Sequence, residues 1–97
     1  MREVVLDGKN WRAPEDLYAA FFEAVGAPAW HGRNFNALRD SIVTGRINQI
    51  EVPYLVRIKN YTQIGDGARR AASDFVGLIE ELRESGCPVE IEVENGN

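Results

Sequence analysis

The chain has little of the chemistry that builds disulfide frameworks and metal centres. Its 97 residues include one cysteine, Cys87, and one histidine, His31. A single cysteine forms no internal disulfide, which favours a reducing compartment, and a single histidine excludes a metal site with two histidine ligands. We therefore expect no cofactor, and we expect Cys87 to be a small core residue rather than a nucleophile.

Long apolar runs are also lacking. The longest, Leu17 to Val25, is interrupted by Glu23 and is far too short to span a bilayer. No signal peptide is visible in the first residues, so the sequence predicts a soluble, cytoplasmic protein. Positive charge is scarce, because 11 Lys and Arg oppose 15 Asp and Glu to give a net charge of −4. This disfavours nucleic acid and anionic membranes as partners and leaves a basic protein open.

Motifs of catalysis are few. The turn after the first expected strand, Asp7-Gly8-Lys9-Asn10, lacks the further glycines of a phosphate-binding loop, and no nucleophile elbow occurs.

A chain of this length makes one domain, residues 1–97, whose polar tail at 94–97 is expected to fray.

Turn and cap signals divide the chain into six elements. They are a strand at 3–6, a helix from Pro14 to Gly26, a helix from Asn34 to about Thr44, a strand at 54–58, a helix from Ala68 to Gly86 and a strand at 89–93. Ala13 is a poor cap, so we expect packing to set the start of the first helix.

The order β-α-α-β-α-β predicts the fold class. A helix lies in each connection between strands, so the three strands should be parallel and joined by right-handed crossovers in an α/β fold. In the last strand Glu90, Glu92 and Glu94 alternate with apolar residues, which indicates one wet face. We therefore expect helices mainly on one face of a three-stranded sheet. A row of glutamates on an edge strand also discourages aggregation.

Helical spacing separates buried from exposed positions in the last two helices. The second helix should bury Phe35, Leu38 and Ile42, whereas Asn36 and Asp40 share an outer face. The third helix is expected to expose Arg70, Asp74, Gly77 and Glu81 on the side opposite its apolar stripe.

The segment from Trp30 to Asp40 places two rings in a loop before a polar helix face. One interpretation is a small cluster in which Trp30 folds back over the helix pair. The other is a contact patch, because Trp and Arg are common anchors of protein interfaces.

At this segment the chain resembles the barstar family of intracellular ribonuclease inhibitors. The family pattern is two aromatics, Gly, any residue, Asn, Leu, Asp, Ala, Leu, often Trp, then Asp. The matching residues are Trp30-His31-Gly32, Asn34-Phe35, Ala37-Leu38 and Asp40. The resemblance covers nearly the whole chain, including Val5-Leu6-Asp7-Gly8, Glu15-Asp16-Leu17, Pro28 and Glu80 to Gly86.

The resemblance implies a binding function. Such inhibitors cover the active site of a small basic ribonuclease and place carboxylates where RNA phosphates would lie. It assigns Asp40 to the central carboxylate, Glu81 to a second acidic contact, Trp30 to a contacting aromatic and Gly32 to close backbone approach. The full expected partner-binding set is Trp30, His31, Gly32, Arg33, Asn36, Arg39, Asp40 and Glu81.

Some positions depart from the family pattern. Asn36 replaces a carboxylate and Arg39 replaces an aromatic, while Arg33 precedes the cap. A charge reversal weakens binding to an old partner, which predicts a different ribonuclease or a related toxin as the target inside the producing cell. Two alternatives stay open: a non-inhibitory interaction or regulatory module, such as a homo-oligomer, and an enzyme using His31 and Asp40 as an acid–base pair.

Overall fold

A parallel sheet organises the chain. The computed structural model describes residues 1–27, 34–44 and 48–96. Its strands lie in the order β1-β2-β3, and both neighbouring pairs are parallel. The elements in chain order are β1 (Arg2–Asp7), α1 (Pro14–Val25), α2 (Phe35–Val43), β2 (Tyr54–Lys59), the 3₁₀ helix η1 (Tyr61–Gln63), α3 (Asp66–Glu84) and β3 (Val89–Val93). The α/β fold class and the order β-α-α-β-α-β are confirmed.

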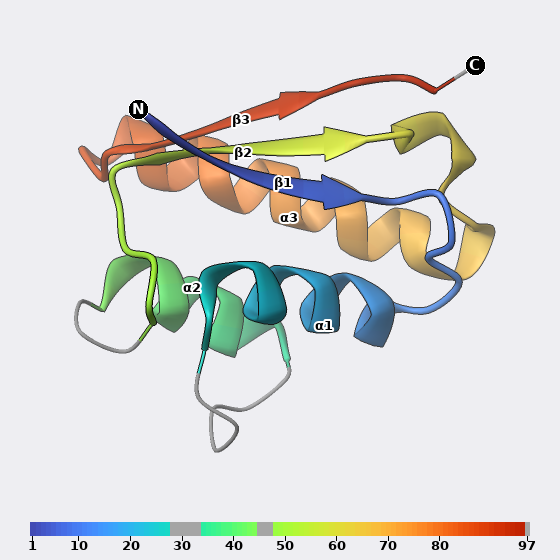
Figure 1. Cartoon of the computed structure of the whole chain (residues 1–97), viewed down its shortest axis with the longest axis horizontal. Coiled ribbons are helices and arrows are strands. Elements are labelled where there is room, and N and C mark those ends of the chain that lie inside the picture. The colour runs from blue at the N-terminus through green and yellow to red at the C-terminus, as the bar shows by residue number, and fades with distance from the viewer. Residues whose placement is uncertain (28–33, 45–47, 97) are drawn as a thin grey trace.

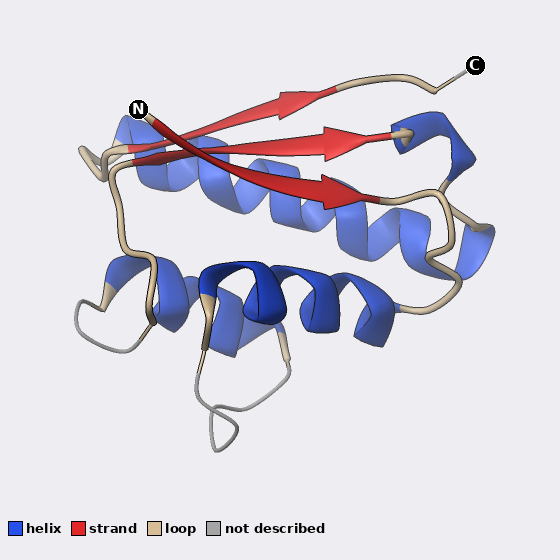
Figure 2. Cartoon of the chain, viewed as in Figure 1, coloured by secondary structure: helices blue, strands red, loops and turns tan. Residues whose placement is uncertain are grey.

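The helices cover one face of the sheet and leave the other face open (Figure 1; Figure 2). The inward residues of neighbouring strands stand side by side, since Val4 pairs with Val56 and Val56 pairs with Ile91. Val4 and Val56 are fully buried beneath the sheet. Two layers therefore enclose one core.

Helix α3 contributes more residues to that core than any other element. Its buried positions are Ala68, Ala71, Ala72, Phe75, Leu78, Ile79 and Leu82, which is the apolar stripe that the spacing predicts. The ring of Phe75 meets the ring of Phe21 from α1 edge-on, with 5.3 Å between centroids. Edge-on aromatic pairs add about 0.5–1.5 kcal/mol beyond the burial of their surface.

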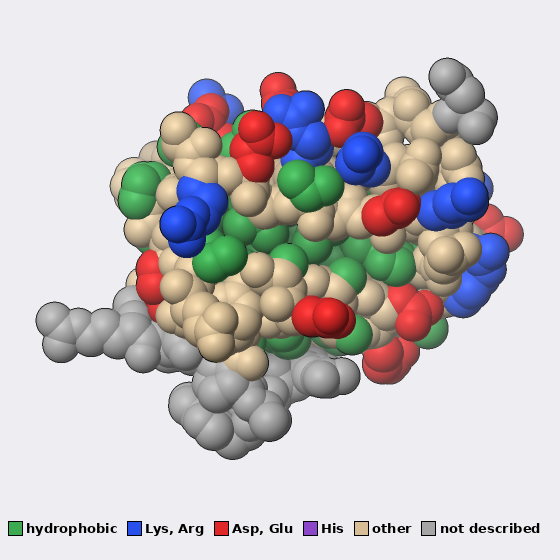
Figure 3. Space-filling view, viewed as in Figure 1, with side chains coloured by type: hydrophobic (Ala, Val, Ile, Leu, Met, Phe, Trp, Pro, Cys, Tyr) green, Lys and Arg blue, Asp and Glu red, His purple; other side chains and the backbone are tan. Residues whose placement is uncertain are grey.

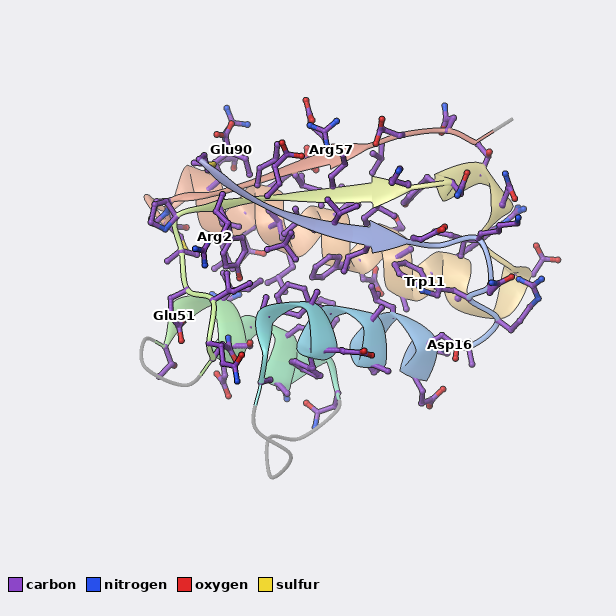
Figure 4. The ribbon with its side chains drawn as sticks, in the orientation of Figure 1. Arg2, Trp11, Asp16, Glu51, Arg57 and Glu90 are labelled. Atoms are coloured by element: carbon purple, nitrogen blue, oxygen red, sulfur yellow. The ribbon has the colours of Figure 1, made fainter. Side chains whose placement is uncertain are left out.

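The open face of the sheet carries charged side chains. Arg57 on the central strand forms ion pairs at 3.0 Å with Glu3 of β1 and at 3.0 Å with Glu92 of β3, and a longer one at 3.8 Å with Glu94. Figure 4 shows Arg57 and Glu90 on the side of the sheet away from the helices. In the space-filling view, charged side chains of both signs gather on the same side of the molecule (top of Figure 3). This accounts for the wet face that alternation along β3 predicts.

The chain after β3 is bonded to η1. The Tyr61 N–H donates to the Glu94 carbonyl at 2.9 Å, and the Thr62 hydroxyl donates to the Gly96 carbonyl at 3.3 Å. These bonds hold the chain after β3 against η1 as far as Gly96, and the fraying expected for residues 94–97 stays a prediction. In the described ranges, no helix has the length and apolar character needed to cross a membrane.

The start of α1 is set by a carboxylate. Pro14 occupies the first turn as predicted, but the expectation that packing sets this end is wrong. The Asp16 carboxylate accepts hydrogen bonds from the backbone N–H groups of Arg12 at 2.7 Å and Ala13 at 3.1 Å. These bonds hold the pKa of Asp16 below its ordinary value of 3.8. They satisfy the two N–H groups just before the helix, and the carboxylate thereby fixes the helix start although the methyl group of Ala13 cannot accept a hydrogen bond.

Replacing Asp16 should therefore destabilise the protein in a pH-dependent way. We expect Asp16→Ala to lower the free energy of unfolding at neutral pH. A lowered folded-state pKa stabilises the fold above the ordinary value of 3.8, and this stabilisation is lost as pH falls through the folded-state pKa. Urea titrations of the unmodified protein and of Asp16→Ala at several pH values should show that the difference in their free energies of unfolding shrinks in acid.

Glu15→Ala is the matched control, because this exposed neighbour lies in the same first turn of α1. An equal loss in both variants at neutral pH, or a gap for Asp16→Ala that persists in acid, would contradict the role of the Asp16 carboxylate.

Candidate interaction surface on helices α2 and α3

Helix α2 begins at a side-chain cap and buries Leu38 and Ile42 as expected, but not Phe35. The Asn34 side chain accepts a hydrogen bond from the Ala37 N–H at 2.8 Å, as a capping residue does. The buried residues of α2 are Ala37, Leu38, Ser41 and Ile42. Phe35, which the spacing assigns to the core, is 37% exposed, so this assignment is wrong. The buried stripe is rotated toward Ala37 and Ser41, and Phe35 is left at its margin.

Phe35 instead lines a groove between two helices. The groove has a volume of about 420 Å³ and is lined by Phe35 and Arg39 of α2 and by Ser73, Asp74, Gly77, Leu78 and Glu81 of α3. Its apolar wall comes from Phe35 and Leu78, while charged groups stand at its rim. The three α3 residues predicted on the outer face that line it, Asp74, Gly77 and Glu81, are all exposed.

An ion pair crosses the groove. The Arg39 Nη1 lies 3.5 Å from the Glu81 Oε1, and the two side chains are 50% and 64% exposed. At the other end, Asp74 accepts a hydrogen bond from the Arg70 Nε at 3.2 Å. Each carboxylate of the groove thus has an arginine of the same chain beside it.

The structure brings together only part of the predicted contact set. Arg39 and Glu81 meet at the groove, whereas Asn36 and Asp40 are exposed on α2 but do not line it. The outward orientation predicted for Asp40 is confirmed. Trp30, His31, Gly32 and Arg33 lie outside the described residues, and so does the proposed fold-back of Trp30.

The segment after α2 holds that helix against α1. The Asn48 side-chain amide donates to the Ser41 carbonyl at 2.9 Å and to its hydroxyl at 2.6 Å. The N–H of Ile50 donates to the carbonyl of Val25, which is the last residue of α1. Ser41 is fully buried, so these bonds satisfy polar atoms that water cannot reach. The position of α2 beside α3 therefore depends on contacts far from the groove.

Nothing among the residues that the structure describes requires glycine at position 77. Gly77 lies inside α3 and is not among the glycines with positive φ. A Cβ built on it would meet no atom within 4 Å among the described residues. Glycine inside a helix costs about 1 kcal/mol relative to alanine. Packing within the described chain does not account for that cost.

Adding a methyl group at this position should stabilise the fold. We expect Gly77→Ala to raise the free energy of unfolding by about 0.5–1 kcal/mol, because it removes backbone freedom from the unfolded chain without a clash. Chemical denaturation of both proteins measures the change.

Gly67→Ala on the same helix is the matched control. A Cβ at Gly67 would collide with the Arg12 carbonyl oxygen, so this substitution should destabilise the protein. Loss of stability in Gly77→Ala would show that the position is constrained by the fold after all.

Sequence reasoning missed the walls of the groove. Phe35 was expected in the core, and Ser73 was not among the expected contact residues, because helical spacing gives the side of one helix but not its neighbour. Leu78 belongs to the predicted apolar stripe, but the stripe does not reveal that its margin borders a groove. The available signal was Gly77, an exposed glycine in a long and otherwise regular helix.

Comparison with known proteins gives the family. Residues 1–94 match the barstar family, which is described as barnase inhibitor. The chain belongs to the barstar family. A Bacillus subtilis (strain 168) protein named "Putative ribonuclease inhibitor YrdF" is 27% identical over 84 residues, which are 87% of this chain and 88% of that protein. The resemblance found in the Trp30 to Asp40 segment thus extends over almost the whole chain.

Proposed function

We propose that this barstar-family chain inhibits a small basic ribonuclease or a related toxin by covering its active site inside the producing cell. Membership of a family described as barnase inhibitor is the observation that carries this proposal. The contact surface would be the exposed face of α2 together with the groove between α2 and α3. On this surface, carboxylates take the place of RNA phosphates and pair with the arginines and lysines of the enzyme.

Two features of the groove support its use by a partner. Gly77 keeps the backbone of α3 accessible at a cost in helix stability that packing within the described chain does not repay. Phe35 leaves 37% of its surface exposed at the groove margin. A partly exposed aromatic ring beside an open stretch of backbone is suited to close packing against a partner.

Asp40 is the carboxylate best placed to meet a basic enzyme. It is exposed on α2, and it forms no ion pair with the described residues within 4.0 Å. Glu81 differs, because Arg39 stands beside it and offsets its charge. We therefore assign the central contact to Asp40. Glu81 would make a second contact only if Arg39 moves away from it.

Barnase is the first enzyme to test, because the family description names it. We expect the protein to form a one-to-one complex with barnase or with another small basic ribonuclease and to suppress RNA cleavage. Asp40→Ala should weaken that complex by about 2 kcal/mol or more, which is about 30-fold in Kd. Calorimetric titration and an RNA-cleavage assay give the two readouts.

Two further variants sharpen this test. Glu84→Ala removes an exposed carboxylate at the end of α3 that does not line the groove, and it should leave Kd nearly unchanged. Gly77→Gln should fill the groove and weaken the complex without unfolding the protein. The inhibitor proposal fails if no basic ribonuclease is bound, and Asp40 leaves the site if its removal costs less than about 0.5 kcal/mol.

Arg39 should control how strongly Glu81 attracts the enzyme. We expect Arg39→Ala to raise the association rate with a basic ribonuclease by about threefold at low salt, because it uncovers the Glu81 carboxylate. The exposed ion pair contributes less than about 1 kcal/mol to stability, so folding should be nearly unaffected. Stopped-flow association measured at two salt concentrations tests this.

Arg83→Ala is the control with the same change in net charge, because Arg83 lies on α3 outside the groove lining. If both variants associate faster by the same factor, the change in net charge explains the effect, and the Arg39–Glu81 pair does not. A slower association in Arg39→Ala alone would mean that the guanidinium itself contacts an acidic group on the partner.

A further inference from the structure

We propose that the free edge of β3 and the adjoining flank of α3 bind an extended, basic segment of a partner protein as a fourth strand of the sheet. The sheet order β1-β2-β3 makes β3 an edge strand. An edge strand presents unpaired N–H and C=O groups that another chain can use. This surface differs from the groove between α2 and α3, and the proposal does not depend on ribonuclease inhibition.

The pairing of β3 shows which backbone groups face outward. The N–H of Glu94 donates to the Ile58 carbonyl of β2 at 2.8 Å. Alternate residues of a strand direct their backbone groups to opposite sides, so Glu92 and Glu90 also face β2. The backbone groups of Ile91 and Val93 therefore point to the outer edge, where an added strand would bond.

An apolar flank lies beside this edge. Val93 is 45% exposed, although the alternation of β3 predicts it buried. Its partial exposure follows from its place near the end of an edge strand that has no neighbour on its outer side. Ile91 of β3 and Val76 of α3 are likewise only partly buried at the margin of the core. The core is thus incompletely covered on the β3 side.

A cavity deepens this flank at the carboxyl end of the strands. Its volume is about 330 Å³, and it is lined by Tyr61, Thr62, Ile64, Arg69 and Ala72. Arg69 and Ala72 share a face of α3 with Val76, whereas the groove toward α2 runs along Gly77 and Glu81 on another face. The Tyr61 N–H is bonded to the Glu94 carbonyl, which places the cavity beside the end of β3. An apolar side chain from an added strand could enter it.

The negative charge along the β3 edge favours a basic segment as the added strand. Glu90 and Glu92 alternate with apolar residues along β3, and Glu94 follows directly after the strand. Glu90 points away from the helices (Figure 4). One guanidinium, that of Arg57, serves Glu92, Glu94 and also Glu3. The row therefore keeps an excess of negative charge. Lysine or arginine directly opposite would form favourable cross-strand pairs.

The same charge opposes a second copy of this chain. Pairing β3 with β3 would bring glutamate rows together, and like charges directly opposite destabilise a ladder. The fitting occupant is a segment whose basic side chains alternate with apolar ones. The apolar side chains would cover Val76, Val93 and the cavity, and the basic ones would lie along the glutamates.

A short peptide of alternating lysine and valine, blocked at both ends, is the direct probe. We expect it to slow hydrogen exchange at the amides of Ile91 and Val93 in the full chain, measured by NMR. Glu90→Lys should weaken binding by about fivefold at low salt, because one cross-strand pair turns repulsive. Glu84→Lys makes the same charge change at an exposed position at the end of α3, and it should leave peptide binding unchanged.

A backbone variant separates strand addition from charge attraction. Val93→Pro removes a donor that points away from β2, so the peptide should no longer protect the Ile91 amide, while thermal melting confirms the fold. Val93→Thr keeps the donor and should still bind. The proposal is overturned if a glutamate–valine peptide protects the edge equally, or if the lysine–valine peptide leaves Ile91 and Val93 unprotected. It is also overturned if light scattering shows a dimer and these two amides are already protected without peptide.

Discussion

The burial of the apolar stripe of α3 is the interaction on which the rest of the structure depends. Phe75 sits at its centre and meets Phe21 of α1 edge-on, while the same helix packs beneath the sheet. Because seven α3 residues are buried in one stripe, the rotation of the helix about its axis is set. That rotation turns Gly77 and Glu81 toward α2 and leaves Ala72 and Val76 under the edge of β3. Both candidate surfaces are flanks of this one packed helix.

Intramolecular arginines decide which carboxylates are available. Arg39 stands beside Glu81, Arg70 beside Asp74, and Arg57 among the glutamates of the open sheet face. A net charge of −4 therefore does not describe any one surface of the molecule. For a protein that meets basic partners, local pairing tunes encounter more than total charge does. On the two candidate surfaces, Asp40 and Glu90 differ from their neighbours because no described ion pair offsets either carboxylate.

Local signals in the chain were sufficient for most of the architecture. The alternation of β3, the Asn34 cap and the apolar spacing of α3 each depend on residues within a few positions of one another. The order of elements then requires parallel strands. The start of α1 was misjudged because the capping group, Asp16, follows the helix start and reaches back to it. Phe35 was misjudged because a short helix has an apolar stripe whose margin depends on its neighbours.

The sequence by itself determined the element order, the family resemblance, and the outward orientation of Asp40 and Glu81, because these follow from periodicity and motif. Only the tertiary structure decided that Arg39 meets Glu81, that Phe35 borders a groove, and that Val93 stays partly exposed. These facts depend on how helices and strands distant in the chain are placed against one another. Ile50 illustrates the reason, since its N–H donates to the carbonyl of Val25, 25 residues earlier, and so ties the segment after α2 to the end of α1.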